Sequence, residues 1–195
     1  RTRFMDRLHD DGIDLHCILG NHDVYYRNTN EINSIRELFE GDLNLYEKPE
    51  VVNFDGLDVA FLPWVNKENV DESIEFIKTA AAPILFGHLE LEGYEVIRGV
   101  NFNGGGTDPG LFSRYEKVFS GHFHCRQEKG NVYYMGTQYQ ITFGDLNETK
   151  GFHVFDTDTR DIEFIENPYK MFHTLKYDDA NGPIDTDNLT GLEYL

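Results

Sequence analysis

Residues 18–23 read Ile-Leu-Gly-Asn-His-Asp, and this stretch decides the fold that we expect. The apolar run 15–19 ends at a glycine, which predicts a short buried strand that leads directly into polar side chains. Two later segments share this design: Leu85-Phe86-Gly87-His88 and Phe119-Ser120-Gly121-His122-Phe123-His124. Because ligands in α/β folds bind beyond the carboxyl ends of the strands, we expect the three segments to meet in one crevice.

The polar residues of these segments are candidate metal ligands. Imidazole nitrogens and an amide oxygen suit Mn²⁺, Zn²⁺ or Fe, and a glycine before them lets the backbone turn sharply and approach an ion. A lone Gly-His pair is usually an ordinary turn or a core histidine. Three strand-glycine-ligand segments in one chain are much more specific, and they point to Asn21, His22, His88, His122 and His124 as the working residues.

The rest of the chain alternates strands and helices, which favours an α/β sandwich. Helical spacing or glycine stops predict helices over 4–9, 31–40 and 70–81. The turn dipeptide Asp55-Gly56 predicts a hairpin of strands 51–54 and 57–62. Further strands are expected over 84–86, 118–120, 132–135, 141–143 and 152–156, with 161–165 pairing with the last of these.

Composition and charge restrict the function without deciding it. The chain has 195 residues and a net charge of −18, from 17 basic and 35 acidic side chains, which argues against a general nucleic-acid binder. An acidic protein can still act on phosphate esters where metal ions supply local positive charge. Two cysteines fit a reducing compartment, and no apolar run is long enough to span a membrane, so we expect a cytoplasmic protein without membrane contact.

The ordered motifs Gly20-Asn21-His22-Asp23, Gly87-His88 and Gly121-His122-Phe123-His124 resemble those of the calcineurin-like metallophosphoesterases. Within that superfamily the chain is similar to the SbcD-like DNA-repair nucleases, the branch that includes the recombination-endonuclease subunit of tailed phages. The segments 20–34 and 139–145, together with Lys150-Gly151-Phe152, carry this narrower likeness. The resemblance implies an α/β fold with a β-sandwich and flanking helices.

The resemblance also implies roles for individual residues. Asn21, His88 and His122 would hold the second of two divalent ions, of which Mn²⁺ is the first choice and Mg²⁺, Zn²⁺ or Fe are alternatives. His124 would be a ligand of the first ion. His22 would be the catalytic histidine that protonates the leaving oxygen while a metal-activated water attacks phosphorus, and Asp23 would orient His22.

Two motifs of the family do not precede residue 20 in this chain. They are an Asp-x-His and a Gly-Asp whose carboxylate bridges both metals. Asp14-Leu15-His16 lies at the wrong end of its strand, while Gly41-Asp42 and Gly144-Asp145 follow the histidine motif instead of preceding it. We therefore expect residues 1–168 to be a metallophosphoesterase core without its N-terminal motifs. We expect this chain alone to have little activity, and we expect 169–195 to be an acidic tail or the start of a further region.

Three functions remain open at this stage. The first is a DNA nuclease subunit of a recombination complex, in the host cytoplasm if phage-encoded; the resemblance implies a coiled-coil ATPase partner of the SbcC type and a homodimer in the intact protein. The second is another calcineurin-like phosphatase or nucleotide phosphodiesterase, which the acidity favours. The third is a noncatalytic scaffold with a degenerate site. Arg27 and Lys150, beside the motifs, would contact phosphate or be exposed solvated charges.

Overall fold

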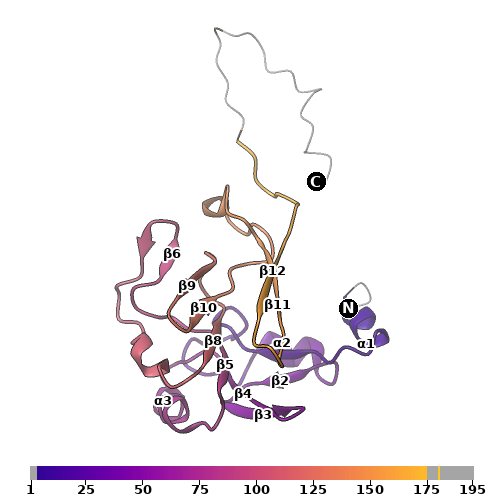
Figure 1. Cartoon of the computed structure of the whole chain (residues 1–195), viewed down its shortest axis with the longest axis vertical. Coiled ribbons are helices and arrows are strands. Elements are labelled where there is room, and N and C mark those ends of the chain that lie inside the picture. The colour runs from indigo at the N-terminus through magenta and orange to yellow at the C-terminus, as the bar shows by residue number, and fades with distance from the viewer. Residues whose placement is uncertain (1–3, 175–179, 181–195) are drawn as a thin grey trace.

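The computed structural model describes residues 4–174 and 180, in which strands predominate and the helices are few and short (Figure 1). The α-helices are α1 (Met5–Asp10), α2 (Ser34–Phe39) and α3 (Val70–Thr79), and the 3₁₀ helices are η1 (Pro109–Phe112) and η2 (Phe143–Asp145). The strands are β1 (His16–Ile18), β2 (Asn44–Tyr46), β3 (Glu50–Phe54), β4 (Leu57–Leu62), β5 (Ile84–Gly87), β6 (Glu95–Ile97), β7 (Val100–Asn101), β8 (Lys117–Ser120), β9 (Gln127–Lys129), β10 (Val132–Tyr134), β11 (Gly151–Phe155) and β12 (Ile162–Glu166).

A mixed six-stranded sheet with the order β3-β4-β5-β8-β10-β9 forms the centre of the fold. Its inner strands β4, β5, β8 and β10 are parallel, and β3 and β9 pair antiparallel at the two edges. The parallel register aligns Leu62 with Gly87, Gly87 with Ser120, and Ser120 with Tyr134. The carboxyl ends of these four strands therefore lie at one edge of the sheet.

Each face of the central sheet packs against different elements. Side chains alternate between the faces, as strand geometry requires: Leu85 and Val118 join one core cluster, while Ile84 and Phe119 join the other. The first cluster includes Ile77 of α3 and residues around η1. The second includes residues of β2, β11 and β12, so strands cover that face. The result is an α/β fold with α3 and η1 on one side of the central sheet and β2, β11 and β12 on the other.

A short parallel pair, β1 with β2, carries the first ligand segment to this edge of the sheet. The carbonyl of Leu19, directly after β1, accepts a hydrogen bond of 2.8 Å from the amide of Trp64, two residues after the end of β4. This bond ties the end of β1 to the end of the central sheet.

Most of the expected elements are confirmed. The hairpin of β3 and β4 turns at Asp55 and Gly56, both with positive φ, which is the backbone conformation that this turn requires. β11 and β12 pair antiparallel as expected. The helix expected over 31–40 begins only at Ser34, because the Asn33 side chain caps it by accepting the Arg36 amide.

The prediction of a strand over 141–143 is wrong. Thr142 and Asp145 form a capping box, in which each side chain bonds to the backbone of the other residue, and this box opens the 3₁₀ helix η2. β2, β6, β7 and β9 were not expected, since each is only two or three residues long and shows no clear alternation.

No helix of the described part of the chain is long and apolar enough to cross a membrane. The division at residue 168 stays a prediction. Most of the expected acidic tail, 175–179 and 181–195, lies outside the described residues.

Candidate metal centre

Three ligand segments far apart in sequence meet at the carboxyl edge of the central sheet. The amide of His88 donates to the Leu62 carbonyl at 3.2 Å, and the Gly121 amide donates to the Gly87 carbonyl at 3.1 Å. These bonds continue the parallel ladder one residue beyond β5 and β8. Together with the bond between Leu19 and Trp64, they bring the segments that begin at Gly20, Gly87 and Gly121 together.

Asn21, His88 and His122 point one polar atom each at a common point. The Nε2 atom of His88 lies 2.9 Å from Oδ1 of Asn21. The Nδ1 atom of His122 lies 3.3 Å from that oxygen and 3.3 Å from the His88 Nε2 atom. We call these three residues the ligand triangle. The convergence that the sequence predicted for these residues is what the structure shows.

The size of the ligand triangle fits a transition-metal ion. With metal–ligand bonds of about 2.1 Å, two ligands of an octahedral or tetrahedral ion lie about 3.0 to 3.4 Å apart. The three edges of the triangle measure 2.9 to 3.3 Å. The donors, two imidazole nitrogens and an amide oxygen, are those that Mn²⁺, Zn²⁺ and Fe accept. The described residues therefore fit one divalent ion at this point.

Two glycines and the only tryptophan enclose the His88 ring. A Cβ atom built on Gly20 would lie 2.8 Å from the His88 Cε1 atom, and one on Gly121 would lie 3.1 Å from its Nδ1 atom. The Trp64 ring meets His88 edge-on, with the ring centroids 6.0 Å apart, and lies 5.4 Å from the His122 ring. A Cβ atom at position 20 would therefore force the His88 imidazole to shift, and one at position 121 would make a tight contact with the same ring.

Burial keeps both histidines of the ligand triangle neutral, as metal ligation requires. Burial is the main cause that lowers the pKa of His88 to about 3, and the charges that His122 and His22 can carry lower it further. Burial also lowers the pKa of His122, although Glu90 partly opposes this. At neutral pH a lone pair on each ring is therefore available to a metal ion without loss of a proton.

His122 has two features that are common at functional sites. Its Nε2 atom lies 3.5 Å from a carboxylate oxygen of Glu90, while its Nδ1 atom belongs to the triangle. A carboxylate near the second nitrogen of a ligating histidine fixes the ring and its tautomer. The backbone of His122 has φ +81°, a left-handed conformation that costs a non-glycine residue about 1–3 kcal/mol. The fold holds this residue in place against that cost.

His22 and Asp23 lie next to the ligand triangle with different exposure. The His22 side chain is exposed, and its charge lowers the pKa of His88 and of His122, so it lies close to both. Asp23 is half-buried, and its carboxylate accepts a hydrogen bond of 2.7 Å from the Gly20 amide. That bond closes the turn that presents Asn21. The expected role of Asp23 in orienting His22 remains a prediction.

His124 faces a buried ion pair that the sequence did not reveal. Its Nδ1 atom lies 3.6 Å from Asp145, and Asp145 pairs with Lys150 at 2.7 Å. The Lys150 ammonium also donates to the His124 carbonyl at 2.8 Å. Lys150 is buried and paired, so the expectation of an exposed or phosphate-contacting lysine is wrong. The ion pair supports the loop that carries His124.

The described residues do not assemble a site for the first of the two expected ions. Among residues 4–174 and 180, no group of three or more His, Cys, Asp and Glu side chains is arranged to hold a metal ion. The ligand triangle is not such a group, because one of its three ligands is an asparagine, Asn21. The expectation that His124 binds a first ion, and the expectation of two ions, therefore remain predictions.

Sequence reasoning missed Glu90, Trp64 and Asp145. Glu90 follows His88 by two residues, and in extended chain such residues share a face, so this spacing was a usable signal. Trp64 follows β4, whose end lies at the same edge of the sheet. Asp145 stands three residues after Thr142, which is the spacing of a capping box.

Two further histidines of the described residues pack against aromatic rings away from the ligand triangle. The Nδ1 atom of His16 lies 2.7 Å from the Tyr46 hydroxyl and its ring stacks on Phe61, so it is a core histidine. His153 packs beside Phe164, with the ring centroids 5.0 Å apart. Neither joins the ligand triangle.

Comparison with known proteins gives one informative relative. No protein-family model matches the chain. Over 187 residues, the chain is 40% identical to a protein named exonuclease subunit 1 of Enterobacteria phage T4. The match covers 95% of this chain and 54% of the relative, so the chain spans about half the length of the relative that it matches.

Proposed function

We propose that this chain contributes a metal-binding half-site to a metal-dependent phosphodiesterase, the DNA nuclease subunit of a recombination and repair complex. The observation that carries the proposal is the ligand triangle of Asn21, His88 and His122, whose edges of 2.9 to 3.3 Å suit one divalent ion. Similarity to an exonuclease subunit over nearly the whole chain supports the nuclease assignment.

Divalent ions would supply the chemistry that an acidic protein lacks. A bound pair of Mn²⁺, Mg²⁺, Zn²⁺ or Fe ions would place positive charge beside the phosphoryl oxygens and lower the pKa of a bound water. The chain has a net charge of −18, and all three corners of the triangle are neutral, so the protein itself provides little charge to attract a phosphodiester. This is why we include the metal in the proposal.

Different residues of the site would bind the metal ions, donate a proton and support the loop of His124. Asn21, His88 and His122 would hold the ion, with Glu90 steadying the His122 ring from behind. His22, which is exposed and adjacent, would give a proton to the leaving oxygen. His124 would be a ligand of the other ion, the first of the pair, and the ion pair of Asp145 and Lys150 would fix the loop of His124.

The relative is named an exonuclease subunit, which supports the proposal of a partner protein. We propose a coiled-coil ATPase of the SbcC type that controls access to DNA, a homodimer of the intact protein, and a location in the host cytoplasm. The calcineurin-like metallophosphoesterase fold is part of the same proposal. The mixed sheet with ligands at its carboxyl edge supports it.

A second candidate function is hydrolysis of smaller phosphoesters, such as nucleotides or phosphoproteins. The excess of 35 acidic over 17 basic side chains favours it, because a long polyanion is repelled by such a surface.

A substrate comparison with the protein at its full natural length tests the proposal. The assay measures Mn²⁺-dependent hydrolysis of single-stranded DNA, duplex DNA and a nitrophenyl phosphodiester, by the wild type and by His88→Ala. The proposal expects DNA cleavage that needs Mn²⁺ and that the variant loses. Cleavage of the small ester without cleavage of DNA would favour the second candidate. No metal-dependent hydrolysis of any substrate would indicate a noncatalytic scaffold and overturn both.

A further inference from the structure

The loop between the metal-binding turn and α2, residues 24–33, carries aromatic side chains into solvent. Tyr25 is 76% exposed and Tyr26 is 50% exposed. Burial of a tyrosine ring normally stabilises a fold, so two neighbouring exposed rings on one loop suggest that the loop contacts another molecule.

The two tyrosine rings leave open faces. Their centroids lie 4.8 Å apart, and their planes are inclined at 88°, so the edge of one ring meets the face of the other. In this arrangement the pair covers at most one face of one ring, and the exposure of both side chains leaves ring surface in contact with solvent. A flat aromatic molecule can stack on such a face, and each nucleobase is a flat aromatic molecule.

Backbone hydrogen bonds hold the loop in a fixed shape. The Tyr25 amide donates to the Ile32 carbonyl at 2.9 Å, and the Ser34 amide donates to the Asp23 carbonyl at 2.8 Å. A β-bridge joins Val24 to Asn33 between these two bonds. The loop is therefore a short hairpin, with Tyr25 in its paired part and Tyr26 directly after it.

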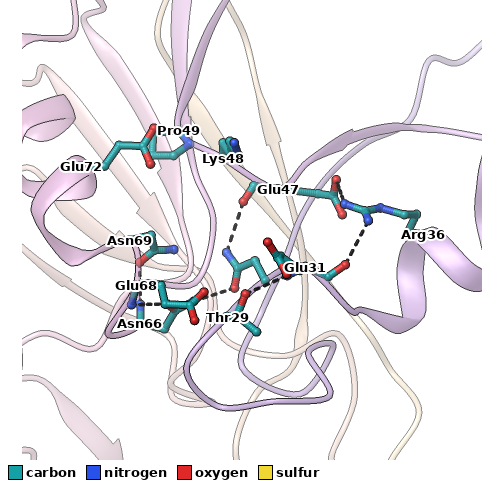
Figure 2. Close-up of a pocket in the computed structure, with 11 residues that line it drawn as sticks. Thr29, Glu31, Arg36, Glu47, Lys48, Pro49, Asn66, Glu68, Asn69 and Glu72 are labelled. Carbon is teal, nitrogen blue, oxygen red and sulfur yellow. Dashed lines mark hydrogen bonds and ion pairs between the residues drawn. The ribbon is translucent and has the colours of Figure 1, made fainter.

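Two buried asparagines fasten the hairpin to the rest of the fold. Asn33 donates to the Asn30 carbonyl at 3.0 Å and to the Glu47 side chain at 2.6 Å. Asn30 donates to the carbonyls of Glu47 and Trp64, both at 3.2 Å, and accepts from Asn66 at 2.9 Å. Figure 2 shows the pocket at this junction, which Thr29 and Glu31 of the hairpin line together with Glu47 and Asn66. Because Asn30 also bonds to Trp64, the hairpin is tied to the residue that covers the ligand triangle.

The hairpin lies close in sequence to His22 and carries one basic residue, Arg27, and one acidic residue, Glu31. Tyr25 follows His22 by three residues, so their Cα atoms are at most about 11 Å apart. The next residue after the tyrosines is Arg27, which is exposed, and within residues 4–174 and 180 its side chain forms no ion pair. An aromatic pair beside a free guanidinium offers stacking for bases and a charge for a phosphate.

We propose that Tyr25 and Tyr26 form a stacking platform for an unpaired nucleobase of the DNA strand that enters the metal site, with Arg27 contacting a backbone phosphate. The inference rests on the proposed function and names its substrate more closely, as single-stranded DNA or a frayed end. Bases in an intact duplex stack on each other and do not offer a face to the platform.

Binding to two oligonucleotides of equal charge tests this proposal. A labelled oligothymidylate and an abasic oligonucleotide of the same length are titrated with the full-length protein in EDTA, and binding is followed by fluorescence anisotropy. The wild type is expected to bind the oligothymidylate more tightly. Tyr25→Ala and Tyr26→Ala are each expected to weaken that binding roughly 5- to 100-fold and to leave abasic binding unchanged.

A conservative variant of Tyr25 and a neutral variant of Arg27 separate stacking from other roles. Tyr25→Phe keeps the ring face and is expected to bind both oligonucleotides as the wild type does. Arg27→Gln is expected to weaken the binding of both oligonucleotides equally. It is also expected to reduce the slope of log affinity against log salt concentration by about one, as the loss of one phosphate contact does. Equal wild-type affinity for both oligonucleotides, or no binding of either, overturns the platform. These binding results do not depend on hydrolysis, so they can fail while the metal-dependent activity stands, and the reverse also holds.

Discussion

The Nε2 atom of His88 lies 2.9 Å from the Oδ1 atom of Asn21, although 67 positions separate the two residues in sequence. The two residues meet because Asn21 follows the end of β1 and His88 follows the end of β5, and both strand ends lie at the same edge of the sheet. His122, which follows the end of β8, completes the ligand triangle. Such a meeting of three neutral donors is the structural basis of the metal-dependent function that we propose.

Loss of one corner of the triangle is expected to remove metal binding. His88→Ala should lower the affinity of the full-length protein for Mn²⁺ or Zn²⁺ by at least about 100-fold, since loss of an outer-shell partner alone costs 10- to 100-fold. Isothermal titration calorimetry of each protein with the metal ion measures the affinity. His153→Ala, on β11, is the matched control and should bind as the wild type does. Equal affinities in both variants would exclude His88 as a ligand.

Acid should destabilise the metal-free protein partly through His88. Its pKa is about 3 in the folded state, mainly through burial, and about 6.5 in the unfolded chain. Between these values only the unfolded state binds the proton, so the free energy of unfolding falls as the pH is lowered from about 6.5 towards 3. From pH 7.5 to 5 this contributes roughly 2 kcal/mol. Urea denaturation in EDTA should show a smaller loss for His88→Asn. The same loss in both proteins would contradict the depressed pKa.

The space beside His88 is expected to depend on glycine at position 20. In Gly20→Ala the new methyl group would lie 2.8 Å from the His88 Cε1 atom, so the ring must move away from Asn21. We expect metal affinity to fall roughly 10- to 100-fold with the fold retained. In the control Gly144→Ala the nearest atom is 3.5 Å away, an ordinary contact, and affinity should not change. An unchanged affinity in Gly20→Ala would show that His88 can move without harm to the site.

The buried pair of Asp145 and Lys150 is expected to stabilise the loop of His124. Burial alone would raise the pKa of Asp145, but hydrogen bonds from Lys150, Thr142 and Ile141 outweigh it and lower the pKa to about 2. Lys150→Met leaves that carboxylate buried without its cation, which should lower the free energy of unfolding by about 3–5 kcal/mol. The exposed control Lys170→Met should change it by less than about 0.5 kcal/mol. A loss below about 1 kcal/mol in Lys150→Met would mean that the pair contributes little.

The sequence predicted the elements that rest on local patterns. The apolar runs that became β5 and β8 and the turn at Asp55-Gly56 are signals within a few residues, and each was confirmed. The predicted strand 141–143 failed for a physical reason. The apolar residues Ile141 and Phe143 flank Thr142, which imitates strand alternation, whereas the bond between Thr142 and Asp145 closes a turn.

The ligand set could be predicted because its residues follow strands that end at one edge. The residues that pack around the ligands could not be predicted, because their contacts depend on the distances between strands that are far apart in sequence. The close approach of the His88 ring to Gly20 and Gly121 arises only when the three strand ends are brought together. The burial of Lys150 depends on a carboxylate, and a lysine gives no local sign of being buried.

The most direct test of the central claim is the position of a bound ion. Crystals of the full-length protein grown with Mn²⁺ would be measured for anomalous scattering from manganese. We predict a peak about 2.1 Å from Oδ1 of Asn21, Nε2 of His88 and Nδ1 of His122. Saturating Mn²⁺ with no peak at this point, or with manganese bound only elsewhere, would contradict the account.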